Sequence, residues 1–176
     1  MNFLEKIKIE KFTTHDEKEV KELIKNIHSK IYFNETNIYI YNNLMYKLFF
    51  NGYDFILDYS LKIIYRKKII GVMLLSDFSF YWLLEAHKED NKNISKNIRK
   101  YKNKEGLRSV FFGVDIKYQK MGIGSKMIEY VRENYKQFDF LWGVQHKDIS
   151  NLDFFLKRRK VVAEIEDGIY TVQDLK

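Results

Sequence analysis

The 176-residue sequence contains no cysteine. A disulfide framework, a thiolate metal site and a cysteine nucleophile are therefore all excluded. Proline is also absent, and together with the abundance of Lys, Ile, Asn and Tyr this is the pattern that a biased codon composition produces. No apolar run is long enough to cross a bilayer, and the first residues, MNFLEKIKIEK, lack the apolar core of a signal peptide. We therefore expect a cytoplasmic protein with no membrane partner.

The length and composition are those of one folded domain. Apolar residues make up 45% of the chain and aromatic residues 16%, which is enough to build a core and unlike a disordered segment. We expect residues 1–176 to form a single domain. The formal net charge of +7 is compatible with a nucleic-acid-binding protein. It is equally compatible with a ligand that carries phosphates, so charge alone does not decide between them.

The most informative stretch covers residues 107–132. Its first part, residues 110–116, is β-branched and aromatic, as in a buried strand. Glycines at positions 122 and 124 follow, and they would let a phosphate approach the backbone closely. After them, apolar side chains recur at helical spacing on one face, namely Ile123, Met127, Ile128 and Val131. A strand, a glycine loop and a helix N-terminus predict an anion site, because the first N–H groups of a helix have no intrahelical partner.

Gln119, Gly122 and Gly124 have the spacing Q-x-x-G-x-G. Between a strand and a helix, this string resembles the acyl-CoA-binding signature of the GCN5-related N-acetyltransferase (GNAT) superfamily. It is not the dinucleotide fingerprint, because the third glycine is missing, and no Walker A lysine–serine pair follows. The resemblance implies an α/β (α+β) fold with a mixed central sheet of about six to seven strands, flanking helices and a strand–helix–strand unit that binds acyl-CoA. A tight turn that binds no ligand is the alternative interpretation.

The rest of the chain fits the element order of that superfamily. The predicted elements begin with a strand at 5–12 and a first helix that follows a cap at Thr14 or Asp16. The apolar face of this helix comprises Val20, Leu23, Ile24, Ile27 and Ile31. A second helix covers 40–48, and it is followed by strands at 59–65, 69–75, 110–116 and 138–144, a short helix at 151–160, and strands at 161–165 and 168–172. Gly71 is expected at a bulge within its strand.

Residues 81–106 form an insertion relative to this order. They begin apolar and then become rich in lysine and asparagine, with seven Lys and Arg against four Asp and Glu. A solvated surface segment is one interpretation, because charge runs are usually solvated. A lid, or an element that recognises the acceptor, is the other.

The resemblance also implies roles for individual residues. The pantetheine arm would lie between the parallel strands at 110–116 and 138–144. The backbone N–H of Val114, beside Gly113 at an expected bulge, matches the group that polarises the thioester carbonyl. The residues matched to acyl-CoA binding are Phe112, Val114, Gln119, Lys120, Met121, Gly122, Ile123, Gly124, Ser125 and Asn151. The lysines that could meet the 3′-phosphate are Lys117, Lys120 and Lys126.

The expected chemistry departs from the superfamily pattern at two positions. Phe155 occupies the position of a tyrosine that acts as general acid in relatives, and a phenyl ring cannot donate a proton. Arg108 occupies the position of the glutamate base found in histone-modifying relatives. The possible substitutes are Glu85, Glu105, Asp115 and His146, each of a residue type more common in structural or surface roles.

Three functions are compatible with the sequence. We predict an acyl-CoA-dependent N-acyltransferase that passes acetyl from acetyl-CoA, or another acyl group, to a small-molecule or peptide amine, as a monomer or homodimer. A CoA-sensing or partner-binding module without catalysis is the first alternative, motivated by Phe155. A nucleic-acid-associated protein is the second, motivated by the net charge and by aromatic residues expected at the surface, such as Trp82 and Tyr101. No metal is expected, because His15 and His28 have no partner at ligand spacing.

Overall fold

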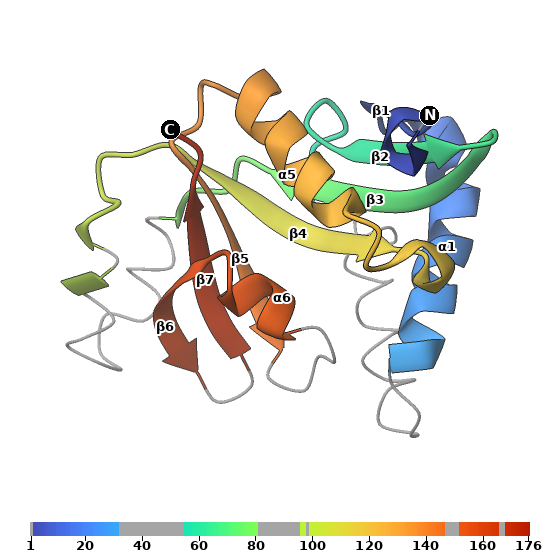
Figure 1. Cartoon of the computed structure of the whole chain (residues 1–176). Helices are drawn as coiled ribbons and strands as arrows, with labels where there is room; N and C mark the ends of the chain where they lie inside the picture. The colour runs from blue at the N-terminus through green and yellow to red at the C-terminus, as the bar shows by residue number, and fades with distance from the viewer. Residues whose placement is uncertain (1, 32–54, 81–95, 98, 147–151, 166–167) are drawn as a thin grey trace. The chain divides into compact units, whose positions relative to one another are not determined.

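The computed structural model describes residues 2–31, 55–80, 96–97, 99–146, 152–165 and 168–176. The predictions for a helix at 40–48, for most of the 81–106 insertion and for Asn151 lie outside these residues. The described strands form a seven-stranded sheet in the order β1-β2-β3-β4-β5-β7-β6 (Figure 1). Strand β4 is parallel to β5, whereas β1–β2, β2–β3, β5–β7 and β6–β7 are antiparallel. This mixed sheet with helices confirms the predicted α/β (α+β) fold.

The described elements follow the predicted order, with changed boundaries. They are η1 (Phe3–Glu5), β1 (Lys8–Lys11), η2 (Thr14–Asp16), α1 (Glu17–Ile31), β2 (Leu61–Tyr65), β3 (Lys68–Ser76), β4 (Gly106–Val114), η4 (Ile116–Tyr118), α5 (Ile123–Asn134), β5 (Phe140–His146), α6 (Leu152–Leu156), β6 (Lys160–Ile165) and β7 (Gly168–Asp174). Strand β4 ends two residues earlier than predicted. The reason is that the carboxylate of Asp115 accepts a 3.0 Å hydrogen bond from the backbone N–H of Lys117, which starts the turn η4.

The chain divides into two compact units. Unit 1 comprises Met1–Ser76 and Val110–Val131, and unit 2 comprises Asp77–Ser109 and Arg132–Lys176. Strand β4 therefore contributes its first residues to unit 2 and its last residues to unit 1. Each unit has its own cluster of buried hydrophobic side chains.

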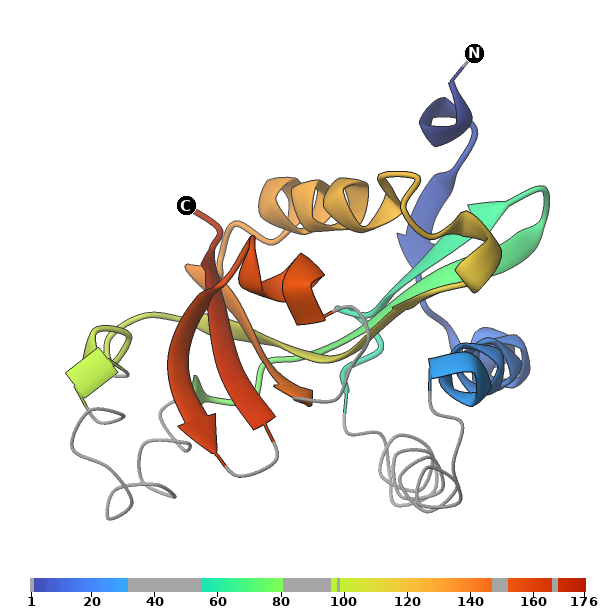
Figure 2. The ribbon, with the colours of Figure 1, turned by 60° about the horizontal axis from the view of Figure 1, so that its bottom comes forward.

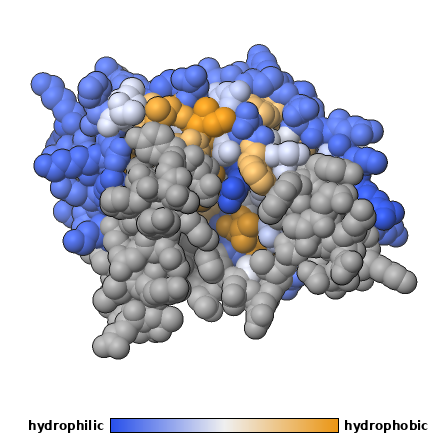
Figure 3. All heavy atoms as spheres, turned by 180° about the vertical axis from the view of Figure 1, so that it is seen from behind, coloured by the Kyte–Doolittle hydropathy of each residue, from blue (hydrophilic) through white to orange (hydrophobic). Residues whose placement is uncertain are grey.

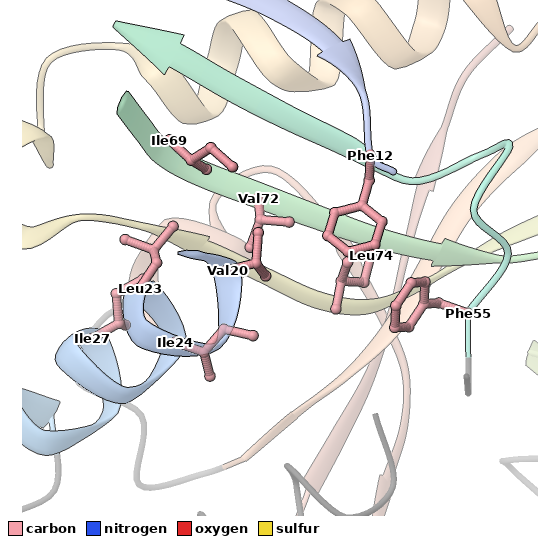
Figure 4. Packing of buried hydrophobic residues seen from close by; sticks show 9 residues of the cluster. All are labelled: Phe12, Val20, Leu23, Ile24, Ile27, Phe55, Ile69, Val72 and Leu74. Atoms are coloured by element: carbon pink, nitrogen blue, oxygen red, sulfur yellow. The ribbon is translucent and has the colours of Figure 1, made fainter. Parts of the chain in front are cut away.

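The core of unit 1 lies between α1 and β3. Figure 4 shows Val20, Leu23, Ile24 and Ile27 of α1 together with Ile69, Val72 and Leu74 of β3 and with Phe12 and Phe55. The buried face of α1 is the apolar face that the sequence predicts. The helix is preceded by a local cap in which Asp16 Oδ2 accepts hydrogen bonds of 2.7 Å from both the backbone N–H and the hydroxyl of Thr13. Thr13 holds the N-cap position of the 3-10 turn η2, and Asp16, one of the two predicted caps, directly precedes α1.

The hairpin of β2 and β3 is built as predicted. Its turn residues Arg66 and Lys67 have φ angles of 49° and 65°, the left-handed values that a tight hairpin turn requires. The strand register shifts between Ile63 and Ile64, beside Gly71. A Cβ at Gly71 would lie 2.7 Å from Ile63 Cδ1 and 3.2 Å from the carbonyl oxygen of Gly113. The predicted bulge near Gly71 is therefore present, and a side chain at this position would force Ile63 and the carbonyl of Gly113 to shift.

The core of unit 2 is aromatic. The ring of Phe140 lies 5.3 Å from that of Phe80 and 4.8 Å from that of Tyr101, measured between centroids. Tyr101 is buried, so the expectation that it is a surface aromatic is wrong. Its ring packs against Phe80 and Phe140, which are distant from it in the sequence. Trp82, the other aromatic residue of that expectation, lies outside the described residues.

The face drawn in Figure 3 is mostly polar where it is coloured, in line with a charged content of 31%. None of the described helices combines the length and the apolar character that crossing a bilayer would require.

Candidate functional site

The glycine loop is held to the end of β4 by Gln119. The side-chain amide of Gln119 donates a 2.9 Å hydrogen bond to the carbonyl oxygen of Val114. The resemblance matches this side chain to acyl-CoA binding, and the structure shows it in a contact that positions the loop. The bond fixes the start of the loop five residues after the last residue of the strand.

The loop itself contains two residues with left-handed backbone. Lys120 has a φ of 61° and Gly122 a φ of 83°. A left-handed conformation is uncommon for a residue with a Cβ, and turns that contain such residues form concave sites in which successive N–H groups bind anions. Met121 and Gly122 are both exposed. The loop is thus an exposed turn of the type that cradles a phosphate.

Helix α5 begins directly after Gly122. The first helical bond runs from the N–H of Lys126 to the carbonyl of Gly122, at 3.1 Å. The N–H groups of Ile123, Gly124 and Ser125 precede that bond and have no partner in the preceding turn of the helix. The structure therefore places Met121, Gly122 and these three residues at one helix N-terminus, which attracts negative charge.

The predicted apolar face of α5 anchors the loop from behind. Its members Ile123, Met127, Ile128 and Val131 are all buried. Because these four side chains fix the helix, the first turn of α5 keeps its position relative to the glycine loop. The expectation for this helix is confirmed.

Three lysines were candidates for the 3′-phosphate, and the structure separates them. Lys126 Nζ donates a hydrogen bond to the backbone carbonyl of Leu4 in η1. Lys117 and Lys120 are exposed, and no ion pair of either is recorded among the described residues. Lys117 and Lys120 are therefore the better candidates for a phosphate contact.

The end of β4 is closely packed against α1. A Cβ at Gly113 would lie 2.8 Å from the ring of Phe111 and 2.9 Å from Ile27 Cδ1. Just beyond it, the N–H of Asp115 donates a 2.8 Å hydrogen bond to the carbonyl of Ile70 on β3. These contacts fix the backbone on both sides of Val114, whose N–H was predicted to polarise a thioester. The neighbouring Phe112 lies on the same strand and is partly buried.

In unit 2, the predicted acid position is part of a buried group. Phe155 of α6 is 4% exposed, and α6 lies against β5 (Figure 2). The guanidinium carbon of Arg159 lies 5.2 Å from the centroid of the Phe155 ring. Arg159 is itself 5% exposed, and burial lowers its pKa to about 10.

Arg159 is a residue that the sequence analysis missed. It stands in the run Lys157-Arg158-Arg159-Lys160, which reads as a solvated basic segment. The available signal was helical spacing, since Arg159 follows the buried Phe155 by four residues. Among the described residues, neither terminal guanidinium nitrogen of Arg159 has a hydrogen-bond partner.

The proposed substitutes for the general acid and base have other environments. Asp115 caps η4, and the exposed Glu105 donates its backbone N–H to the carboxylate of Asp139 at 2.9 Å. The guanidinium of Arg108 lies over the rings of Phe78 and Trp142, 5.7 and 5.6 Å from their centroids. Glu85 lies outside the described residues, and only the backbone of His146 is described, at the end of β5.

A metal centre has no support in the described part of the chain. The residues described there contain no group of three or more His, Asp or Glu side chains arranged to hold a metal ion.

Comparison with known proteins gives matches at the level of structure. No family model matches the chain, and no curated protein matches it in sequence. Among solved structures, it is similar to the PaiA N-acetyltransferase from Thermoplasma acidophilum in complex with coenzyme A, with a TM-score of 0.63, 14% identity and coverage of 96% of this chain and 98% of that one. A GNAT-family acetyltransferase from Listeria monocytogenes gives a TM-score of 0.63 at 8% identity, with coverage of 96% and 94%. The ribosomal-protein-S18-alanine N-acetyltransferase from Escherichia coli gives 0.59 at 11% identity, with coverage of 97% and 94%.

These neighbours share nearly their whole length with this chain, and their sequences share little. At such low identities the likeness concerns the fold, and the Q-x-x-G-x-G loop after β4 is the local feature that agrees with it. The protein therefore has the fold of the GCN5-related N-acetyltransferase superfamily.

Proposed function

We propose that the protein is an acyl-CoA-dependent N-acyltransferase, most simply one that transfers acetyl from acetyl-CoA to an amine. The observation that carries the proposal is the loop of residues 119–125. It is tied to β4 by Gln119, turns through two left-handed residues and ends at the exposed N-terminus of α5. A coenzyme A complex of a protein with the same fold supports this assignment.

The cofactor's charged groups fit the groups available in unit 1. The pyrophosphate would accept hydrogen bonds from the N–H groups of residues 121–125, where the helix dipole adds to the attraction. Lys117 and Lys120, both exposed beside this loop, would contact the 3′-phosphate. Binding of this kind is electrostatic in part, so it should weaken as salt concentration rises.

The reaction would proceed by direct attack of the neutral amine on the thioester carbonyl. A C–N bond forms, the C–S bond breaks, and the amine proton leaves to a base or to water. The N–H of Val114 would stabilise the oxyanion, and holding the two reactants in place supplies up to about 7–11 kcal/mol in well-oriented systems. The CoA thiol has a pKa near that of cysteine, about 8.5, so its thiolate can depart without full protonation.

A CoA-binding module without catalysis is the second candidate. It is favoured by one observation, that Phe155 stands at the position of the usual acid and its ring lies beside the guanidinium of Arg159. The nucleic-acid alternative has lost one of its motivations, because Tyr101 is buried.

Calorimetric titration with acetyl-CoA, followed by a CoA-thiol release assay over a panel of amines and N-terminal peptides, separates these candidates. Binding with turnover supports the acyltransferase. Binding without turnover on the whole panel favours the module, and no binding at millimolar acetyl-CoA rejects both.

A further inference from the structure

Arg159 is a buried charge that the proposed acyl transfer does not use. Its side chain is 5% exposed. Neither of its terminal nitrogens, Nη1 and Nη2, has a hydrogen-bond partner among the described residues. An uncompensated buried guanidinium is costly to folding, and buried polar groups almost always have partners. A position of this kind needs an explanation beyond packing.

The guanidinium lies over β5 at Gly143. A Cβ built on Gly143 would be 3.3 Å from Arg159 Nη1 and 3.4 Å from Gln145 Nε2. The same point lies 3.0 Å from the carbonyl oxygen of Ser109 on β4. Glycine at this position therefore lets the guanidinium and the buried Gln145 amide come together above the strand.

This point is also where the ladder between β4 and β5 stops. The ladder comprises three pairs, the last of which joins Arg108 to Trp142. Gly143 is the next residue on β5. The ring of Phe155 also contacts the guanidinium, with its centroid 5.2 Å from Arg159 Cζ. Two hydrogen-bond donors, the Arg159 guanidinium and the Gln145 amide, thus lie near the end of the β4–β5 ladder, beside the ring of Phe155.

The donors at this point suit a carboxylate. A guanidinium presents a planar fork that binds both oxygens of a carboxylate at once. The neighbouring Gln145 amide adds an N–H donor at the same place. Burial is the only cause that lowers the pKa of Arg159, to about 10, so the side chain keeps its positive charge at neutral pH. Among the described residues, no group accepts a hydrogen bond from the terminal nitrogens of this buried cation, and an anionic ligand would satisfy these donors.

We propose that Arg159, together with Gln145, binds a carboxylate group of one of the two reactants, over Gly143. The carboxylate would belong either to the amine acceptor, as in an amino acid, or to a dicarboxylic acyl group on CoA. This inference rests on the proposed function, and it adds the class of substrate to it.

The first test measures the site without any turnover. Thermal unfolding of the full chain is followed with succinate and, as the neutral probe, succinamide. The carboxylate raises the melting temperature of the wild type and of Arg158→Gln, the matched control at the exposed neighbouring position, and leaves Arg159→Gln unchanged. Arg159→Met without ligand melts higher than the wild type, because an unpaired buried charge is gone. A lower melting temperature of Arg159→Met, with no effect of succinate on the wild type, would show a structural role and overturn the proposal.

The second test identifies the source of the carboxylate. For the acceptor, kcat/KM is compared between amino acids and their amides with acetyl-CoA; for the acyl group, it is compared between succinyl-CoA and acetyl-CoA with one amine. For whichever reactant supplies the carboxylate, Arg159→Gln lowers kcat/KM of the carboxylate substrate roughly 100-fold and changes that of the neutral substrate little. Arg159→Lys keeps the charge but lacks the planar fork, and it recovers part of the lost kcat/KM.

Equal losses on carboxylate and neutral substrates in both arms would overturn the proposal. Acetyl-CoA affinity of Arg159→Gln stays at the wild-type value, because the phosphates bind in unit 1. Failure of the wild type to bind acetyl-CoA would remove the proposed acyltransferase, and the succinate measurement would still decide whether Arg159 binds carboxylates.

Discussion

A negative charge placed in the first turn of α5 should weaken acetyl-CoA binding and leave the fold intact. Gly124 is the better position for this test than Gly122. Gly122 has a φ of 83°, and its Cβ would lie 3.2 Å from Leu4 Cδ1, so a side chain there would strain the fold. Gly124 is inside α5 and is not among the described residues with positive φ. A side chain at position 124 therefore suits the backbone.

Gly124→Glu places a carboxylate beside the expected pyrophosphate. By Coulomb's law, two unit charges about 6 Å apart at an effective dielectric constant of about 40 repel by about 1.4 kcal/mol. For a pyrophosphate with two charges the cost is about 3 kcal/mol, or roughly 100-fold in Kd. The same carboxylate interacts favourably with the helix dipole at the N-terminus of α5, so the free energy of unfolding of Gly124→Glu should not fall below that of an uncharged variant at the same position.

Gly124→Gln is the matched control, because it has the same shape without the charge. Titration calorimetry with acetyl-CoA should give a Kd for Gly124→Glu that is at least tenfold above that of Gly124→Gln, and the gap should narrow at high salt. Equal affinities of the two variants would refute the reasoning and place the phosphates away from this helix.

Three further predictions concern the two units. Tyr101→Ala should lower the free energy of unfolding by about 3 kcal/mol, and Tyr101→Phe by less than about 1, because the buried ring packs on Phe140; urea unfolding measures both, and equal small losses would contradict the burial. Burial opposes the charge of Asp16, but hydrogen bonds from Lys62 and Thr13 hold the pKa of its carboxyl below the usual value. The stability that it contributes is therefore present above about pH 3.9, its unfolded pKa, and lost as pH falls through the lower folded value; thermal melts of Asp16→Asn should lack that acid step, and an unchanged profile would count against it. Phe155→Tyr should raise turnover up to about tenfold if thiolate departure limits the rate, and an unchanged rate over the amine panel would mean that the ring does not face the sulfur.

The elements that local patterns specify could be predicted from the sequence. The buried face of α5 follows from helical spacing, and the hairpin turn at Arg66 and Lys67 follows from two apolar runs on either side of a short basic segment. The glycine loop was identified by spacing alone, and the structure adds the bond from Gln119 to Val114 that holds it. These features depend on residues that are near one another in the chain.

Features that depend on tertiary packing could not be predicted. Tyr101 stands in a lysine- and asparagine-rich tract, and only its contact with Phe140 from a distant strand shows it to be buried. Arg159 lies in a basic run, and it is buried beside Gly143, where a Cβ would lie 3.3 Å from its Nη1. The helix α6 ends at Leu156 rather than at Lys160, because Lys160 pairs with Val172 of β7. At each of these positions the local sequence pattern favoured another result: an exposed Tyr101, an exposed Arg159 and a longer helix α6.

Hydrogen exchange with and without acetyl-CoA tests the central claim most directly, because the claim concerns backbone N–H groups. We expect acetyl-CoA to slow exchange of the amides at residues 121–125, which precede the first intrahelical bond of α5 and so exchange readily in the free protein. Peptides that cover β6 and β7 serve as an internal control, since their amides are paired in the sheet. Protection of residues 121–125 at saturating acetyl-CoA is the predicted result, and unchanged exchange there under saturation would contradict the account.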